Sequence, residues 1–106
     1  MNEFERIELR EADHSGHRDR LRARLLREGA DGLNDRELME FLLCFVLPRQ
    51  DVSGMAAQLV EHFGSAQATL RADVRALTRV PGVGRRAADW LVCVGETLLD
   101  CEAAVE

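Results

Sequence analysis

The stretch over residues 77–91 constrains the fold of this chain most, because it reads as two helices joined by a Pro-Gly-Val-Gly turn. Pro81 disfavours the helical conformation at Val80, so the first of these helices should end there. Gly82 and Gly84 can then reverse the chain, since glycine tolerates positive φ and has no Cβ. The sequence therefore predicts a helical hairpin with a tight, glycine-containing turn.

This turn is also a candidate anion site. The first amides of the second helix have no partner within that helix and lie at the positive end of its dipole. Arg85 and Arg86 add two cations there. The alternative is a plain helical hairpin in which the arginines form a solvated face. We favour phosphate contact, because the small pair Ala87 and Ala88 allows the close helix crossing that such a turn needs.

Composition indicates one soluble, helical domain. The chain has 106 residues, of which 46% are hydrophobic and 31% charged, with two prolines and no tyrosine. The longest apolar run, residues 41–47, is too short to cross a bilayer, and the acidic start is unlike a signal peptide, so we expect a cytoplasmic protein without a membrane partner. Its histidines and cysteines lack the spacing of a zinc site, and no helix combines a nucleophile with a base. We therefore expect a non-enzymatic domain with no organic cofactor.

The formal charge of −5 is unevenly distributed along the chain. Residues 1–13 carry two arginines against five acids, and residues 91–106 carry four acids and no base. The remaining body is slightly positive, so the net charge does not exclude a nucleic-acid partner. We divide the chain into an acidic, mobile tail over 1–13, a helical domain over 14–100 and a C-terminal tail over 101–106.

Residues 17–28 form a basic amphipathic pattern, with leucines on one face and arginines around the rest. Four of these arginines are a candidate auxiliary patch for nucleic acid: Arg18, Arg20, Arg22 and Arg24. The alternative is a solvated face whose arginines pair with nearby acids and cover apolar surface with their stems. The sequence leaves both interpretations open.

The next helix is expected at the centre of the core. Asn34 and Glu37 have the spacing of a capping box, residues 38–47 are apolar nearly all round, and Pro48 ends the segment. Phe41 is expected to be buried there with its neighbour Leu42. Further helices are expected over 52–63 after an Asp51 cap, over 66–70 after Ser65, from Asp73 to Val80, and from Arg85 to Leu98 or Leu99. The predicted fold is an all-α, compact bundle of five to six helices.

The pattern apolar-x-x-Val-Pro-Gly-Val-Gly-x-x-x-Ala over residues 77–88 resembles the helix-hairpin-helix motif of DNA repair and recombination proteins. The resemblance implies sequence-independent binding of a nucleic-acid backbone. Phosphate oxygens would bond the hairpin amides of Gly82, Val83, Gly84 and Arg85. It also implies a site for a monovalent cation on the main-chain carbonyls of Thr78, Val80 and Val83.

A short internal repeat predicts two such units in tandem. The segment Cys44-x-x-Leu47-Pro48 aligns with Leu77-x-x-Val80-Pro81. Arg49 and Asp51 then stand where the second unit has Gly82 and Gly84, and the carboxylate of Asp51 would repel phosphate. The first unit is therefore expected to be degenerate, with DNA contact confined to the second.

Five segments in order resemble the N-terminal domain of the RadC family over roughly residues 14–99: Gly16-His17-Arg18-x-Arg20-Leu21-Arg22, Leu33-x-Asp35-x-Glu37-Leu38-x-Glu40, Pro48-Arg49-x-Asp51-Val52, Phe63-Gly64-Ser65 and Val80-Pro81-Gly82-Val83-Gly84. Members of that family continue into a JAB/MPN metalloprotease-like domain whose zinc motif is His-x-His with a downstream Asp. No such motif occurs in this sequence. We therefore expect an excised N-terminal domain or a truncated homologue.

The resemblance implies a non-catalytic, DNA-repair-associated module that contacts DNA phosphates through residues 81–86. Such binding is expected to be weak, insensitive to sequence and strongly dependent on salt. The alternative is a protein-interaction or oligomerisation module that positions the missing domain, with protein partners or self-association in place of DNA.

Overall fold

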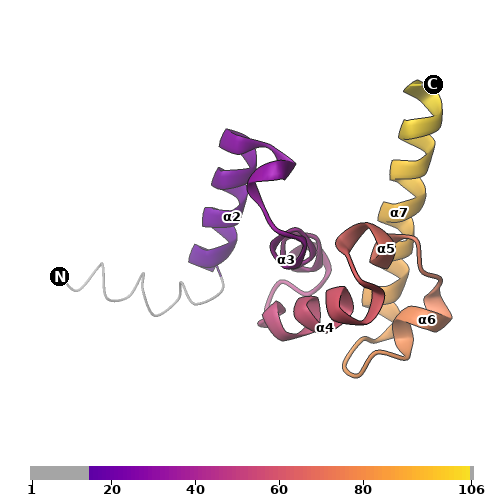
Figure 1. The fold of residues 1–106 in the computed structure, drawn as a ribbon. Helices are drawn as coiled ribbons and strands as arrows, with labels where there is room; N and C mark the ends of the chain where they lie inside the picture. The colour runs from indigo at the N-terminus through magenta and orange to yellow at the C-terminus, as the bar shows by residue number, and fades with distance from the viewer. Residues whose placement is uncertain (1–14, 106) are drawn as a thin grey trace.

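The computed structural model describes residues 15–105 and the side-chain surroundings of residues 16–98. Within this range the chain forms six α-helices, one short 3-10 helix and no strand (Figure 1). The elements are α2 (Ser15–Glu28), η1 (Ala30–Gly32), α3 (Asp35–Val46), α4 (Ser53–Phe63), α5 (Ala66–Leu70), α6 (Val74–Thr78) and α7 (Arg85–Val105). The all-α bundle predicted from the sequence is confirmed.

Helix α3 lies at the centre of the bundle and contacts α2, α4, α5 and α7. Figure 1 shows it between α2 on one side and α5 and α7 on the other. Met39 and Leu43 are fully buried and lie one turn apart, so they share the inner face of α3. They pack in one core with residues from α4, α6, the hairpin and α7, among them Leu59, Leu77, Val80, Val83 and Leu91.

The expectation that α3 is buried all round is wrong. Phe41 and Leu42 are only half-buried, and Phe45 is 64% exposed. A helix that is apolar on every face needs neighbours on every face. Helix α3 has neighbours over its inner face, whereas its outer face is left partly open between α2 and α7.

The caps predicted at Asn34, Ser65 and Asp73 are confirmed, whereas the N-cap residue of α4 is Val52 and not Asp51. The Asn34 side chain accepts a hydrogen bond from the Glu37 amide, and the Glu37 carboxylate accepts one from the Asn34 amide. Ser65 and Asp73 cap α5 and α6 by accepting hydrogen bonds from the amides of Ala68 and Ala76. Gly64 ends α4 with a left-handed φ of 98°. Each cap satisfies a backbone group that a helix end leaves without a partner.

Several helix ends differ from the prediction. Helix α4 begins at Ser53, whose amide donates to the Asp51 carboxylate at 3.0 Å, and α6 ends at Thr78, before Val80. Helix α7 continues to Val105, so the segment 101–106 assigned to a tail is helical up to residue 105. No glycine or proline follows Leu99 to stop this helix. The predicted tail over 1–13 lies outside the described residues.

A glycine that the sequence analysis did not single out sets the distance between α5 and α7. Gly95 is buried, and a Cβ atom built on it would lie 2.0 Å from the backbone oxygen of Leu70. That distance is far inside van der Waals contact. The two helices can therefore cross this closely only because residue 95 has no side chain.

We predict that Gly95→Ala destabilises the domain by roughly 1–3 kcal/mol, because α5 must move away from α7 to admit the methyl group. Gly54→Ala is the matched control. Gly54 lies in the first turn of α4 with nothing within 4 Å of its Cβ position, so the same change should be neutral or stabilise by about 0.5 kcal/mol. Urea unfolding measures both. Equal effects at the two sites would contradict the close crossing.

Candidate nucleic-acid interface

The turn between α6 and α7 has the geometry of a type II turn. The Val83 amide donates to the Val80 carbonyl at 3.1 Å, with Pro81 and Gly82 as the central residues. Gly82 has a φ of 87°, which this turn type requires at its second central position. The side chains of Val80 and Val83 are buried in the core. These two buried side chains therefore anchor the turn to the core, and backbone atoms form much of its outer surface.

Helix α7 starts directly after this turn with its backbone accessible. The Gly84 carbonyl accepts the first helical hydrogen bond, from the Ala88 amide at 3.1 Å. Gly84 does not have a positive φ, and a Cβ atom there would meet nothing within 4 Å. No acceptor among the described residues takes a hydrogen bond from the amides of Gly82, Gly84 or Arg85. Three of the four amides expected to bond phosphate are thus open, whereas that of Val83 is engaged within the turn.

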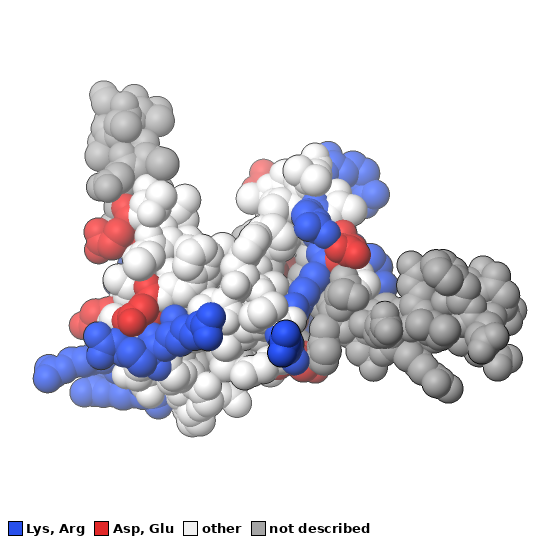
Figure 2. Space-filling view, turned by 180° about the vertical axis from the view of Figure 1, so that it is seen from behind, with Lys and Arg blue, Asp and Glu red and all other residues white. Residues whose placement is uncertain are grey.

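The basic side chains near the turn differ in how freely they can reach a ligand. Arg85 donates from Nε to Asp89 at 2.9 Å, so it is held along α7. The side chain of Arg86 is exposed and has no partner among the described residues. Arg75 and Arg79 are exposed as well, on α6 and just after it. Figure 2 shows basic residues gathered at the end of the molecule where α7 begins.

Arg85 and Arg86 were predicted from the sequence, whereas Arg75 and Arg79 were not. Their spacing of four residues, in the segment that runs directly into the turn, was the available signal. The hairpin therefore has more basic side chains around it than the motif alone indicated.

The first hairpin, between α3 and α4, has a related turn with a different central peptide. The Gln50 amide donates to the Leu47 carbonyl at 3.4 Å, and Pro48 again follows the acceptor. Arg49 stands where the second turn has Gly82, and no described non-glycine residue has a positive φ. A type II turn is therefore not formed here. Without it, the peptide between the two central residues is flipped relative to the second hairpin.

The carbonyls of this first turn bind a cation from the chain itself. The guanidinium of Arg18 donates to the carbonyl oxygens of Leu47 at 3.1 Å and Gln50 at 2.8 Å, and also to that of Pro48. In the internal repeat, Leu47 and Gln50 correspond to Val80 and Val83, two of the carbonyls expected to hold a monovalent cation. The carbonyls of the first hairpin are thus occupied by a side-chain cation from α2, and the loss of phosphate binding at this hairpin stays a prediction.

The remaining arginines of the expected auxiliary patch are also engaged, with one exception. Arg24 donates to the Gly32 carbonyl at 3.0 Å and to Glu37, and Arg22 pairs with Asp19. Only Arg20 is exposed without a side-chain partner among the described residues. Arg18 and Arg24 therefore fasten α2 to α3, and the four arginines do not form a shared free patch.

A buried carboxylate lies in the same contact between α2 and α3. Glu40 is 1% exposed, with an oxygen 2.7 Å from Nε2 of His17 and another 3.6 Å from the guanidinium of Arg36. A charge taken out of water needs such partners. The burial of Glu40 was not predicted from the sequence. Its position between Met39 and Leu43 on the same apolar helix was the signal.

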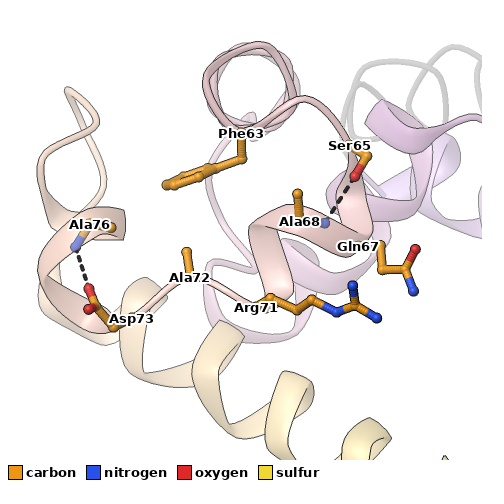
Figure 3. A pocket seen from close by; sticks show the side chains of 8 residues that line it. All are labelled: Phe63, Ser65, Gln67, Ala68, Arg71, Ala72, Asp73 and Ala76. Atoms are coloured by element: carbon orange, nitrogen blue, oxygen red, sulfur yellow. Dashed lines mark hydrogen bonds between the residues drawn. The ribbon is translucent and has the colours of Figure 1, made fainter.

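The hollow in Figure 3 has few polar side chains that are free to bind a ligand or to react. It measures about 510 Å³ and is lined by Phe63, Ser65, Gln67, Ala68, Arg71, Ala72, Asp73 and Ala76. Ser65 and Asp73 use their side chains as helix caps.

Burial raises the pKa of the Cys44 thiol, which lies outside this hollow. Within the described residues no three His, Cys, Asp or Glu side chains are grouped to hold a metal ion, and none of the described helices could cross a membrane.

We predict that Arg18→Ala lowers the free energy of unfolding by about 1–3 kcal/mol, because three carbonyls at the end of α3 lose a charged donor. Arg20→Ala removes the same side chain two residues later, from an exposed position, and should change stability by less than about 0.5 kcal/mol. Denaturant unfolding of both variants gives the comparison. Equal losses would mean that the contact with the first hairpin contributes nothing.

The Glu37 carboxylate predicts a pH dependence. Its hydrogen bond from Arg24, followed by that from the Asn34 amide, holds the pKa of Glu37 below its ordinary value. A depressed pKa adds stability above the unfolded value, and that stability is lost as the pH falls through the folded pKa. Glu37→Gln should therefore destabilise the domain at pH 7, and the difference from the parent should shrink below about pH 4.

Thermal melts from pH 3 to pH 7 would measure this difference. Glu61→Gln, at an exposed position on α4, serves as the control and should stay within about 0.5 kcal/mol of the parent. A Glu37→Gln deficit of constant size over the whole pH range would show that the ionised carboxylate is not the group responsible.

Comparison with known proteins identifies the family. The family model described as UPF0758 N-terminal matches residues 13–88. A UPF0758 protein of Fusobacterium nucleatum subsp. nucleatum is 32% identical over 88 residues, which cover 83% of this chain and 38% of that protein. UPF0758 proteins of Ruegeria pomeroyi and Rhodobacter capsulatus are 46% and 47% identical over 64% and 60% of this chain, and over 30% of their own lengths. No solved structure matches the chain.

The chain thus spans between 30% and 38% of the length of these relatives. The match covers α2 to the first residues of α7, and it includes both hairpins. It also agrees with the resemblance found in the sequence. The chain belongs to the UPF0758 N-terminal family, which is the N-terminal region of the RadC family.

Proposed function

We propose that this domain binds the sugar-phosphate backbone of DNA, without catalysis and without reading base sequence, through the hairpin between α6 and α7. The observation that carries the proposal is the set of open amides at Gly82, Gly84 and Arg85. They lie in a type II turn and at the start of α7, a helix of 21 residues. The positive end of that helix dipole favours an anion there.

Both glycines support close approach by a phosphate. Neither the Gly82 nor the Gly84 Cβ position has any neighbour within 4 Å, so the surface over these amides is open to solvent. The buried side chains of Val80 and Val83 hold the turn in place before a ligand arrives. A site that is already ordered loses little conformational entropy on binding.

The charges around the hairpin favour weak binding. Arg75, Arg79 and Arg86 can reach phosphates on either side of the turn, but Asp89 and Glu96 follow along α7 and the chain carries a net −5. Each neutralised phosphate on duplex DNA contributes about −0.9 to the slope of log K against log salt. A few contacts then give an affinity in the micromolar range or weaker, with a steep loss as salt increases.

We propose further that a monovalent cation binds the carbonyls of Thr78, Val80 and Val83 when DNA is bound. The first hairpin supports this idea, because the corresponding carbonyls of Leu47 and Gln50 hold the guanidinium of Arg18. No side-chain donor among the described residues bonds the carbonyls of Val80 or Val83. Such an ion would place positive charge beside the phosphate site.

We predict that Gly84→Asp lowers affinity for duplex DNA at least tenfold, because its carboxylate would occupy the phosphate position. The backbone conformation of Gly84 suits aspartate, and aspartate is a good helix cap, so the variant should stay folded. Gly54→Asp is the matched control, since it adds the same charge in the first turn of α4. Fluorescence anisotropy with a labelled duplex at several salt concentrations measures both, after circular dichroism has verified folding.

The arginines provide a second comparison on the same titration. Arg86→Ala should reduce the salt slope by about 1, whereas Arg85→Ala should do less, because Asp89 already holds that guanidinium. A folded Gly84→Asp variant that binds as tightly as the Gly54→Asp control would refute the hairpin as the DNA site.

A further inference from the structure

An exposed aromatic side chain lies beside the first turns of α7. Phe45 on α3 is 64% exposed, which is more than any other described phenylalanine or tryptophan. Its ring centroid lies 6.2 Å from that of Trp90 on α7, and 5.3 Å from that of Phe41, which it meets edge to face. Trp90 donates from Nε1 to the Leu42 carbonyl at 2.8 Å, which fixes the indole against α3. The exposed ring of Phe45 is therefore supported by two neighbouring rings.

The contact with Trp90 places Phe45 close to the hairpin between α6 and α7. Trp90 follows Gly84 by six residues, which is about 9 Å along α7 at ~1.5 Å per residue. A DNA strand with a phosphate at the hairpin amides would cover that distance within about three nucleotides, at a rise of ~3.4 Å per nucleotide. Phe45 is therefore within reach of nucleotides that adjoin the bound phosphate.

A free cation lies on α7 between the hairpin and the aromatic rings. Arg86 precedes Trp90 by four residues, so the two side chains lie on the same face of the helix. The Arg86 side chain is exposed and has no partner among the described residues, whereas the nearby Asp89 is paired with Arg85. A positive charge next to an aromatic surface is the combination that binds single-stranded nucleic acid, since the charge contacts the backbone and the ring stacks a base.

The surroundings of Phe45 suit an uncharged group. Phe45 and Phe41 line a hollow of about 210 Å³ between α2 and α3. The charged side chains that also line it are engaged within the chain, Arg18 with the carbonyls of the first hairpin and Arg22 with Asp19. The hollow therefore offers aromatic surface without an unpaired charge, and a nucleobase is flat, aromatic and uncharged.

We propose that Phe45 stacks an unpaired base of a DNA strand whose phosphates bind the hairpin. The inference rests on the DNA-binding function proposed above and narrows its substrate to DNA with unpaired nucleotides, such as an overhang or a fork. Bases inside a duplex are stacked on one another, so a side chain reaches their faces only where the strand is unpaired. Every base has a π-face, so this contact requires no particular sequence.

The test compares three DNA ligands by fluorescence anisotropy at one salt concentration. The first is a labelled blunt duplex, the second is the same duplex with a short thymine overhang, and the third has an overhang of equal length built from abasic nucleotides. The chain should bind the thymine overhang at least about fivefold more tightly than the blunt duplex, the factor that corresponds to ~1 kcal/mol of stacking. The abasic overhang keeps the added phosphates but should lose most of this gain, because it has no base to stack.

Two variants test the aromatic ring itself. Phe45→Leu keeps an apolar side chain but removes the ring, so its affinity for the thymine overhang should fall to that for the abasic overhang. Phe45→Tyr keeps the ring and should retain the preference for thymine. Both changes are at a mostly exposed position and should leave the domain folded, which circular dichroism verifies. The comparison of thymine with abasic overhangs on the parent chain needs no variant, so it decides the matter if either variant unfolds.

Trp90 gives an independent readout, since it is the only tryptophan and its ring lies beside that of Phe45. A base stacked on Phe45 should quench the emission of Trp90. The thymine overhang should therefore quench it at saturation, whereas the blunt duplex and the abasic overhang should quench it much less.

Equal affinity of the parent chain for the thymine and abasic overhangs would overturn the inference and leave the hairpin proposal standing, because binding of the blunt duplex tests that proposal separately. A parent chain that binds none of the three ligands would remove both. A Phe45→Leu variant that keeps the thymine preference would also contradict the inference. If that variant instead abolishes self-association of the parent in sedimentation velocity, the aromatic surface is a protein interface. Loss of the preference in Phe45→Leu, with retention in Phe45→Tyr, supports base stacking.

Discussion

Burial of Met39 and Leu43 on one face of α3 is the packing interaction on which the rest of the structure depends. Helices α4, α5 and α7 contact α3 and contribute residues to the same core, so they are placed by where this face points. Their side chains fill the space over the inner face and leave the outer face partly open. The partial exposure of Phe41 and Phe45 is a consequence, since a nearly all-apolar helix has more apolar surface than its four neighbours cover.

The two hairpins illustrate how one residue changes what a turn presents. Both turns have proline after the first acceptor and a hydrogen bond across four residues. Gly82 adopts a positive φ, and the second turn presents open amides. Arg49 does not adopt a positive φ, and the first turn presents carbonyls to the guanidinium of Arg18. The pair thus consists of an internal cation site and an external candidate anion site.

The arrangement of charge follows from the same contacts. The arginines of α2 that fasten it to α3, Arg18 and Arg24, are unavailable to a ligand, and those around the second hairpin remain exposed. Acidic residues lie further along α7. The domain therefore has exposed arginines around the hairpin and the exposed acids Asp89 and Glu96 further along α7.

The sequence by itself determined the elements that depend on local chemistry. The capping box at Asn34 and Glu37, the caps at Ser65 and Asp73, and the Gly82 turn were all predictable, because each depends on residues within four positions of one another. The RadC relationship was also readable from short ordered motifs. Helix ends were less accurate, most of all for α7, which has no stop signal.

Only the tertiary structure decided which helix faces and side chains contact one another. It showed that Arg18 binds carbonyls 29 to 32 residues away, that Glu40 is buried against His17, and that Gly95 lets α5 reach α7. Periodicity indicates which residues are apolar or charged, but it does not indicate which neighbours are near enough to cover them. The physical reason is that burial and ion pairing are set by contacts between distant segments, and those contacts exist only once the helices have packed.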